Sequence, residues 1–570
     1  MKRRTFLATG VAADAALGLS QTRSAKPASR LKRNYRLLWD QNHGQEGFYN
    51  PPLTAETEAQ AHLGFFEGTP VDAYVCALGP DCGYTVAYPT KVPGMEFIVD
   101  RLNKGAKVGN VRIWCLAENL RRLWEQGIDP LEVQVKEARR LGIDFWFRLS
   151  MNDWHHADHE GNVYRLMGSQ FYIDHPEYRI GKEGVKGWPE RVAQALQSLQ
   201  NYAHPQVRQL RLDIMAESCD RYDVDGFLFD FMRVPGYFPF GEEEKHLPLM
   251  TEFIRQARAI LDRIGTRKGK SIGLAVRIPN TIGGSRRLGM DVPAWVREHL
   301  IDILIPSTFF AADLEEDLRE WAALTRNTPV RLHPAIEEGY RAGHTAGVRT
   351  LSYHPPVLLP LTYDMIRALA ARHWSNGADG LYLFNWFGTI VAYDYDPRRV
   401  LDDIGDPRRL RYKNKRYVIT RTDESFTNCM PHPRQIPARL TAQPLQIRMM
   451  VADDLAAAGS RVEAITLHAH LANLTILDKV QVLFNGQHLQ CQNPLAPGAY
   501  NACLTQWQNY TVPAGRVRTG DNEITFQLVE HNQRLAAELP VEVSDVELAI
   551  KYRYPNGEAE PRPPRTGGQT

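Results

Sequence analysis

The stretch Asp-Gly-Phe-Leu-Phe-Asp-Phe-Met-Arg at residues 225–233 decides the expected fold. Residues 226–229 show no polar alternation, which is typical of a parallel strand that is covered on both faces. Asp225 and Gly226 mark the entry to this strand, and Asp230 follows where the strand should end. A carboxylate in so apolar a run is unfavourable to bury unless it is paired or functional. We therefore expect a buried parallel strand with a chemically significant aspartate at its carboxyl end.

Similar short apolar runs recur along the chain, with helical segments between them. The runs lie at residues 36–40, 71–78, 143–150, 226–231, 272–278, 301–306, 330–333 and 380–386. Amphipathic segments such as 130–141 and 249–263 separate them. Strands that alternate with helices in this way predict an α/β fold, a (β/α)8 TIM barrel over residues 31–405. A doubly wound open sheet is the alternative, but no Gly-rich dinucleotide loop follows the first strand.

The remaining sequence divides into four segments. Residues 1–25 carry Lys-Arg-Arg-Thr-Phe-Leu at residues 2–7, which is similar to a twin-arginine export signal and predicts a periplasmic or secreted protein. Residues 406–440 are expected to be a linker. Alternating apolar residues and turns such as Asn485-Gly486 predict a smaller all-β sandwich over residues 441–554. The Pro- and Gly-rich tail at residues 555–570 is expected to be disordered.

Composition excludes several classes of partner. The chain of 570 residues has 68 Lys+Arg and 66 Asp+Glu, a formal net charge of +2, so a nucleic-acid partner is not expected. The sequence contains no run of about eighteen apolar residues, so no transmembrane segment is expected. No Cys-x-x-Cys pair occurs, and we expect neither a metal nor a cofactor. What stands out is the aromatic content, with 11 Trp, 23 Tyr and 21 Phe.

Polar and aromatic residues follow several predicted strands, at the end of a barrel where active sites form. Tryptophan faces stack on the C–H face of a sugar ring, and Asn, Asp and Arg side chains form directed hydrogen bonds with its hydroxyls. We therefore expect a carbohydrate substrate. The predicted substrate-binding residues are Trp39, Asp40, Arg148, Asn152, Asp153, Trp154, Arg233, Arg277, Asn385 and Trp386.

Glycosidic cleavage usually needs two carboxyl groups, one as acid and the other as nucleophile or base. Asp230 is the predicted nucleophile or base, and Glu337 or Glu338, after the seventh predicted strand, is the predicted general acid. Asp153 is a third candidate carboxylate. The structural alternative for Asp230 is pairing with Arg233 or Arg277. For the two glutamates the alternative is a favourable charge at the start of a helix.

Residues 224–233, residues 378–386 (Ala-Asp-Gly-Leu-Tyr-Leu-Phe-Asn-Trp) and the Arg3-Arg4 signal resemble exported proteins described as glycosyl-hydrolase-like 10, from environmental bacteria. The resemblance covers residues 35–400 and implies a glycoside-hydrolase-type barrel. Its likeliest functional carboxylate follows the fourth strand, which falls on Asp230. The patterns at residues 520–524 and 545–548 resemble accessory sandwiches similar to carbohydrate-binding modules. The sequence thus predicts an exported glycoside hydrolase that acts on a polysaccharide or oligosaccharide.

Two other functions stay open from the sequence. The first is a non-catalytic glycan-binding protein that kept the barrel and lost the chemistry, since the second carboxylate is not unique. The second is a metal-dependent hydrolase that uses the loop Trp-His-His-Ala-Asp-His at residues 154–159, where three histidines and an aspartate are candidate zinc ligands.

Overall fold

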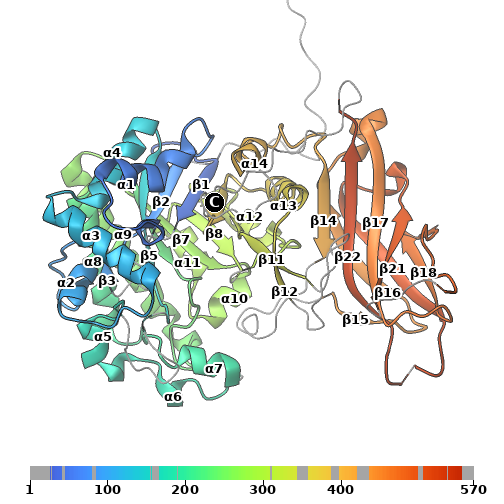
Figure 1. Cartoon of the computed structure of the whole chain (residues 1–570), viewed down its shortest axis with the longest axis horizontal. Helices are drawn as coiled ribbons and strands as arrows, with labels where there is room; N and C mark the ends of the chain where they lie inside the picture. The colour runs from blue at the N-terminus through green and yellow to red at the C-terminus, as the bar shows by residue number, and fades with distance from the viewer. Residues whose placement is uncertain are drawn as a thin grey trace, which may run out of the picture.

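A computed structural model of the chain describes residues 26, 28–41, 45–79, 85–154, 156, 166–188, 190–308, 311–342, 357–386, 397–419, 435–498, 505–535 and 537–554. The expected export signal and the expected C-terminal tail lie outside these residues. Figure 1 shows a part with both helices and strands beside a C-terminal part that consists mainly of strands, from β14 (Lys415–Ile419) to β22 (Glu542–Tyr552). Within the described residues, no helix combines the length and the apolar character that crossing a membrane requires.

The mixed part is built around a curled parallel sheet. Its strand order is β10-β13-β1-β2-β5-β6-β7-β8-β9, and all pairings are parallel. The strands are β1 (Leu37–Gln41), β2 (Ala73–Ala77), β5 (Asp144–Ser150), β6 (Gly226–Asp230), β7 (Gly273–Pro279), β8 (Ile303–Ser307), β9 (Arg331–Leu332), β10 (Ala335–Ile336) and β13 (Leu381–Phe384). Each of the eight predicted runs overlaps one of these strands, and β10 lies outside all of them.

The two ends of this strand order are joined by a short segment of chain. Strand β9 pairs with β8, strand β10 pairs with β13, and His333 and Pro334 separate β9 from β10. Proline has no N–H to donate to a ladder, so it interrupts what would otherwise be one strand. The strands from β1 to β8 also lie side by side in chain order, without the reversal that defines a doubly wound sheet.

Helices follow most of the strands and begin and end where the sequence supplies caps. In α4 (Pro130–Leu141) the side chain of Asp129 accepts hydrogen bonds from Leu131 N and Glu132 N, and Gly142 ends the helix with a φ of 73°. The other helices are α1 (Ala55–Leu63), α2 (Ile98–Asn103), α3 (Val111–Glu125), α5 (Gln170–Asp174), α6 (Gly181–Gly184), α7 (Glu190–Leu196), α8 (Pro205–Arg221), α9 (Leu247–Lys268), α10 (Ile282–Arg287), α11 (Val292–Arg297), α12 (Arg319–Thr325), α13 (Tyr363–Ser375), α14 (Pro397–Ile404) and α16 (Leu455–Ala458), with a 3-10 turn η1 (Gln45–Phe48).

The inner face of the curled sheet is filled by side chains from alternate strand positions. Near the amino ends of the strands this space is taken by the fully buried Trp146. A Cβ atom at Gly226 would come within 2.4 Å of the Trp146 ring, and one at Gly273 within 2.5 Å, so both positions need glycine. An apolar layer that includes Leu38, Leu228 and further residues follows above the indole.

The C-terminal part consists of two antiparallel sheets. One has the order β14-β22-β17-β20 with β15 at β22, and the other has the order β16-β21-β18-β19. The strands are β14 (Lys415–Ile419), β15 (Ala438–Arg439), β16 (Leu445–Val451), β17 (Val462–Ala472), β18 (Lys479–Phe484), β19 (Gln487–Leu489), β20 (Thr505–Thr511), β21 (Gly520–Glu530) and β22 (Glu542–Tyr552). Strands β14 and β15 lie in the range 406–440 that was expected to be a linker. Two small pairs, β3 (Thr85–Val86) with β4 (Glu96–Phe97) and β11 (Gly339–Ala342) with β12 (Val357–Pro360), complete the strands.

The turn at Asn485-Gly486 joins β18 to β19, as its sequence predicts. Both residues have positive φ, 49° and 78°, which is the backbone geometry of a two-residue hairpin turn of type I′.

Candidate active site

Five charged residues form one layer inside the curled sheet at the carboxyl ends of its strands. This charged layer consists of Asp40, Arg148, Asp230, Arg277 and Glu337. Each stands two positions after an apolar residue that faces the interior, so strand alternation turns it inward as well. All five are at most 3% exposed. The carboxyl end of the sheet therefore holds three acidic and two basic side chains out of contact with bulk water.

Asp230, the last residue of β6, lies between the two arginines. Arg148 Nη1 donates to its Oδ2 at 3.1 Å, and Arg277 Nη1 lies 3.2 Å from both carboxylate oxygens. The backbone N–H of Met232 donates to Oδ1 at 2.8 Å. Two guanidinium groups thus compensate the charge of this carboxylate. The sequence suggested Arg233 or Arg277 as a structural partner of Asp230, and Arg277 is the one that contacts it.

Glu337 follows β10 and shares Arg277 with Asp230. Its Oε1 accepts hydrogen bonds from Arg277 Nη2 and, at 3.1 Å, from Ser307 Oγ. Burial raises the pKa of Glu337 to about 7, although Arg277 and Ser307 oppose the shift. This glutamate therefore tends to hold a proton at neutral pH.

The two predicted glutamates differ in their surroundings. Both lie between β10 and β11, and not at the start of a helix, so the interpretation of their charges as helix N-terminal charges is wrong. Glu338 is half-buried, and its backbone carbonyl accepts a hydrogen bond from Leu361 N at 3.2 Å. Glu337 is the member of the pair that belongs to the charged layer.

Asp40, at β1, forms the other end of the charged layer. Its Oδ2 lies 2.9 Å from Arg148 Nε and accepts a hydrogen bond from the Tyr382 hydroxyl. Burial raises the pKa of Asp40 to about 6, against the opposing effects of Arg148 and Tyr382. The contacts therefore run without interruption from Tyr382 through Asp40, Arg148, Asp230 and Arg277 to Glu337.

Sequence reasoning missed three members of this network, Ser307, Tyr382 and Phe384. The Phe384 ring centroid lies 3.5 Å from Arg277 Cζ and 5.6 Å from Arg148 Cζ, so the ring covers both guanidinium groups. Tyr382 and Phe384 occupy alternate positions of β13 and both face inward. Period-two alternation along residues 380–386 was the signal that would have identified them.

The geometry suits acid–base chemistry with two carboxyl groups. Because one guanidinium contacts both Asp230 and Glu337, the two groups lie within the roughly 9.5 Å that separates the carboxyl pair of inverting glycosidases. Burial lowers the pKa of Arg277, but Asp230 and Glu337 outweigh that effect and raise it. Arg277 therefore remains a cation between Asp230 and Glu337, and Glu337 exchanges a proton near neutral pH.

Three of the predicted substrate-binding residues have protein partners instead. Arg233 Nε donates to Asp153 Oδ2 at 3.1 Å, and this buried pair lies outside the charged layer. Asn152 Nδ2 donates to the carbonyls of Gln200 and Gly236 at 2.9 and 2.7 Å, and its Oδ1 accepts from Gln200 N at 3.1 Å. Both amide hydrogens of Asn152 are thus used to hold loops together, which leaves none for a sugar hydroxyl.

The predicted stacking residues fall into two groups. Trp39 and Trp386 are each 1% exposed and pack edge to face with ring centroids 6.0 Å apart, so neither presents a ring face to a sugar. Trp154 and Asn385 are half-buried. Asn385 has a φ of 56°, and its Oδ1 is buried without a hydrogen-bond partner in the described structure. Trp154 and Asn385 are thus more exposed than the two buried tryptophans.

The histidine-rich loop is described at His156. Its ring is buried and packs edge to face against Tyr172, with centroids 4.3 Å apart. His155 and residues 157–159 lie outside the described residues, so the alternative of a zinc site in this loop stays untested.

No family model and no curated protein sequence matches the chain. Solved structures that the chain matches include a cycloisomaltooligosaccharide glucanotransferase from Paenibacillus sp., with 11% identity over 91% of this chain and 57% of that one, at a TM-score of 0.31. An alpha-L-fucosidase from Paenibacillus thiaminolyticus is 14% identical over 87% of this chain and 97% of that one, at a TM-score of 0.32. A maltogenic alpha-amylase from Thermotoga neapolitana is 12% identical over 87% of this chain and 99% of that one, at a TM-score of 0.35. This chain thus spans little more than half the length of the glucanotransferase. At these TM-scores the likeness assigns neither a family nor an activity.

Proposed function

We propose that this protein is an exported (β/α)8-barrel glycoside hydrolase of the glycosyl-hydrolase-like 10 type that cleaves glycosidic bonds of a polysaccharide or oligosaccharide. Glu337 is the general acid and Asp230 the nucleophile or base. The observation that carries the proposal is the contact of both groups with Arg277 at the carboxyl ends of parallel strands, the end where barrel enzymes build their active sites.

The two carboxyl groups differ in the way that the reaction needs. Burial favours the protonated form of Glu337, which can then give its proton to the oxygen of the leaving sugar. Asp230 lies between two guanidinium groups that compensate its charge. As a carboxylate it can attack the sugar or activate a water. Arg148 and Arg277 act as positioning residues, because their contacts fix both carboxyl groups within one rigid network.

Trp154 and Asn385 are the proposed substrate contacts, and the C-terminal sandwich is a proposed carbohydrate-binding module. Export by a twin-arginine signal in residues 1–25 belongs to the same proposal, since a polysaccharide too large to enter a cell has to be met outside it.

A second candidate is a glycan-binding barrel without chemistry. The observation that favours it is the burial of the charged layer, in which acids and arginines compensate one another. Against it stands the proximity of Asp40 and Glu337 to Asp230, because binding alone needs no set of acidic side chains within reach of one another.

The test is a broad polysaccharide and oligosaccharide screen of the purified protein, with analysis of released products and parallel binding measurements. Release of new reducing ends that stops in Glu337→Gln and in Asp230→Asn supports the hydrolase. Binding to a glycan without product from the native chain supports the second candidate and overturns the first.

A further inference from the structure

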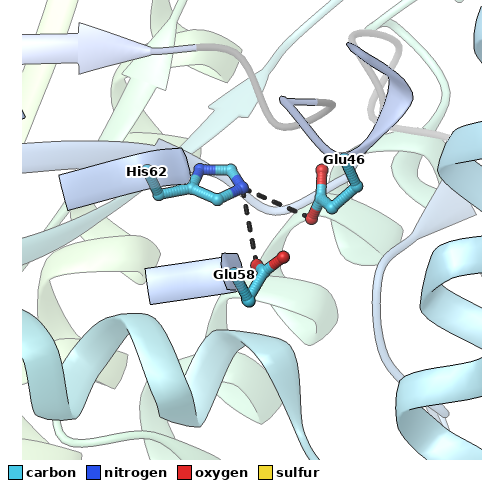
Figure 2. A group of neighbouring side chains, drawn as sticks. All are labelled: Glu46, Glu58 and His62. Atoms are coloured by element: carbon cyan, nitrogen blue, oxygen red, sulfur yellow. Dashed lines mark ion pairs between the residues drawn. The ribbon is translucent and has the colours of Figure 1, made fainter. Parts of the chain in front are cut away.

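A second group of buried titratable side chains lies apart from the charged layer. Glu58 and His62 stand four residues apart on α1, so one face of the helix carries both, and Glu46 comes from η1. Figure 2 shows the two carboxylates turned toward the same edge of the His62 ring. One ligand atom of each residue lies within 4.8 Å of the others, and all three side chains are at most 1% exposed.

The distances within this group suit a shared cation better than direct hydrogen bonds. His62 Nε2 lies 3.4 Å from Glu46 Oε1 and 3.4 Å from Glu58 Oε1. Protein N–H···O hydrogen bonds span about 2.7–3.2 Å, so both contacts are long. Ligand atoms about 2.0–2.1 Å from a tetrahedral zinc ion stand about 3.4 Å from one another. The imidazole nitrogen thus already stands, from each of the two oxygens, at the spacing of ligands around an ion, and all three atoms lie within 4.8 Å of one another.

Outer partners hold the group as they do in metal sites. Tyr74 OH contacts His62 Nδ1 at 3.0 Å, which fixes the ring and turns Nε2 toward the carboxylates. Gln134 Nε2 donates to Glu58 Oε1 at 2.8 Å. The second oxygen of Glu58, Oε2, is buried and has no hydrogen-bond partner in the described structure. An unsatisfied, fully buried carboxylate oxygen in the group is an independent indication that a ligand is bound here.

We propose that Glu46, Glu58 and His62 bind a divalent transition-metal ion, with zinc as the best fit. One imidazole and two carboxylates are ligands that zinc accepts, and the ligand spacing matches its bond lengths. The ion would connect η1, which follows β1, to helix α1, so its role is structural. The sequence gave no expectation of a metal here, because Glu46 is not adjacent to the pair on α1.

The charges of the group are compatible with a bound cation. Among the described residues, Glu58 forms its ion pair with His62 and with no lysine or arginine. Burying a carboxylate is unfavourable unless it is paired or coordinates a metal, and a divalent cation would compensate the two carboxylates that face His62.

The test uses the full chain, stripped of metal with a chelator and then titrated with Zn²⁺. We expect one zinc per chain by elemental analysis after desalting, and a thermal unfolding midpoint that rises by several degrees with zinc. Replacing zinc with Co²⁺ should give the visible absorption of a tetrahedral site. If the native chain binds less than about a tenth of an equivalent and its midpoint ignores both metals, the group is a proton-sharing triad and the proposal is wrong.

Variants locate the site. His62→Gln and Glu58→Gln should each lose the bound zinc and the rise in midpoint. The matched control is His373→Gln, because His373 is also fully buried and faces one glutamate, Glu316, at 3.7 Å. This variant should keep the full zinc content. Equal zinc binding by native, His62→Gln and Glu58→Gln chains would place the metal elsewhere. The Co²⁺ spectrum of the native chain decides the question even where a variant fails to fold.

Discussion

The two ends of the curled sheet use the same residue types in opposite ways. At the amino ends, aspartates that precede a strand accept backbone N–H groups from the neighbouring strand. Asp225 accepts from Phe145 N at 2.9 Å, Asp302 from Leu274 N at 2.8 Å, and Asp379 from Leu332 N at 2.9 Å. At the carboxyl ends, Asp40 and Glu337 accept from arginine, tyrosine and serine side chains.

We expect the aspartates at the amino ends to stabilise the sheet and the charged layer at the carboxyl ends to carry the proposed chemistry. An aspartate that is bound to a neighbouring strand fixes the pairing of the sheet, and its charge is met in part by basic side chains at the surface, such as Lys32 for Asp225. The carboxylates of the charged layer are buried with their countercharges, so a proton added or removed there is felt by the whole network. The proposed barrel enzyme would be expected to have stabilising residues at the amino ends of its strands and reactive groups at the carboxyl ends.

The largest expected effect is that of Asp230→Asn. Catalysis should fall by about 10²–10⁴-fold, because a carboxylate with an acid–base or nucleophilic role is removed. The variant should also lose about 3–5 kcal/mol of unfolding free energy, because Arg148 and Arg277 then lose a buried counterion. Product analysis at equal folded concentration and urea denaturation measure the two effects. Unchanged turnover would remove Asp230 from the mechanism.

Next in size is the pH dependence of Glu337. Its folded pKa of about 7 exceeds the ordinary value of 4.5, so between these pH values the folded protein holds a proton that the unfolded chain releases. The resulting stabilisation is complete below about pH 4.5 and is lost as the pH rises through 7. It amounts to an order of 3 kcal/mol for a shift of this size. Denaturation from pH 4.5 to 7.5 should show a shallower decline in stability for Glu337→Gln than for the native chain.

The titration of Glu337 should also determine how activity depends on pH. Turnover should fall above about pH 7, where Glu337 loses the proton that a general acid donates. A rate that stays level from pH 6 to 9 would mean that another group supplies the proton.

A smaller effect is expected at the amino end, from Asp302→Asn. Asp302 contacts Arg258 Nη1 at 3.0 Å as well as Leu274 N, so the variant should lose about 1–3 kcal/mol of stability. Its kcat per folded molecule should equal that of the native chain. If Asp302→Asn lost as much kcat as Asp230→Asn, the amino ends of the strands would matter for catalysis as much as the carboxyl ends, and the proposed difference between them would be wrong.

The smallest effect is expected at the surface of the amino end. Lys32 is more than half exposed and lies 3.0 Å from Asp144. Lys32→Met should change the unfolding free energy by less than about 1 kcal/mol, because water screens an exposed ion pair. Urea denaturation at two salt concentrations checks this. A loss of several kcal/mol would show that surface cations carry the stability of this end.

The sequence predicts the strands and part of the site, for physical reasons that differ along the chain. Apolar runs with polar residues at their ends identify β6 and place Asp230 at its end, because buried parallel strands leave a strong local pattern. The same pattern does not distinguish Glu337 from Glu338. Side-chain pairing leaves no such pattern: that Arg233 contacts Asp153 and that Arg277 joins Asp230 to Glu337 depends on neighbours far apart in sequence.

Burial was equally hard to predict. Trp39 lies within β1 and Trp386 follows β13, yet the two pack against each other, since a tryptophan near a strand end fills a core as readily as it lines a site. The Glu46, Glu58 and His62 group also escaped prediction, because only the fold brings η1 against α1.

The most direct test of the central claim compares Glu337→Gln with Asp302→Asn on a glycan that the native chain cleaves, at equal folded concentration. The account predicts that product release falls at least about 100-fold in Glu337→Gln and stays within about twofold of native in Asp302→Asn. Undiminished product release by Glu337→Gln would contradict it.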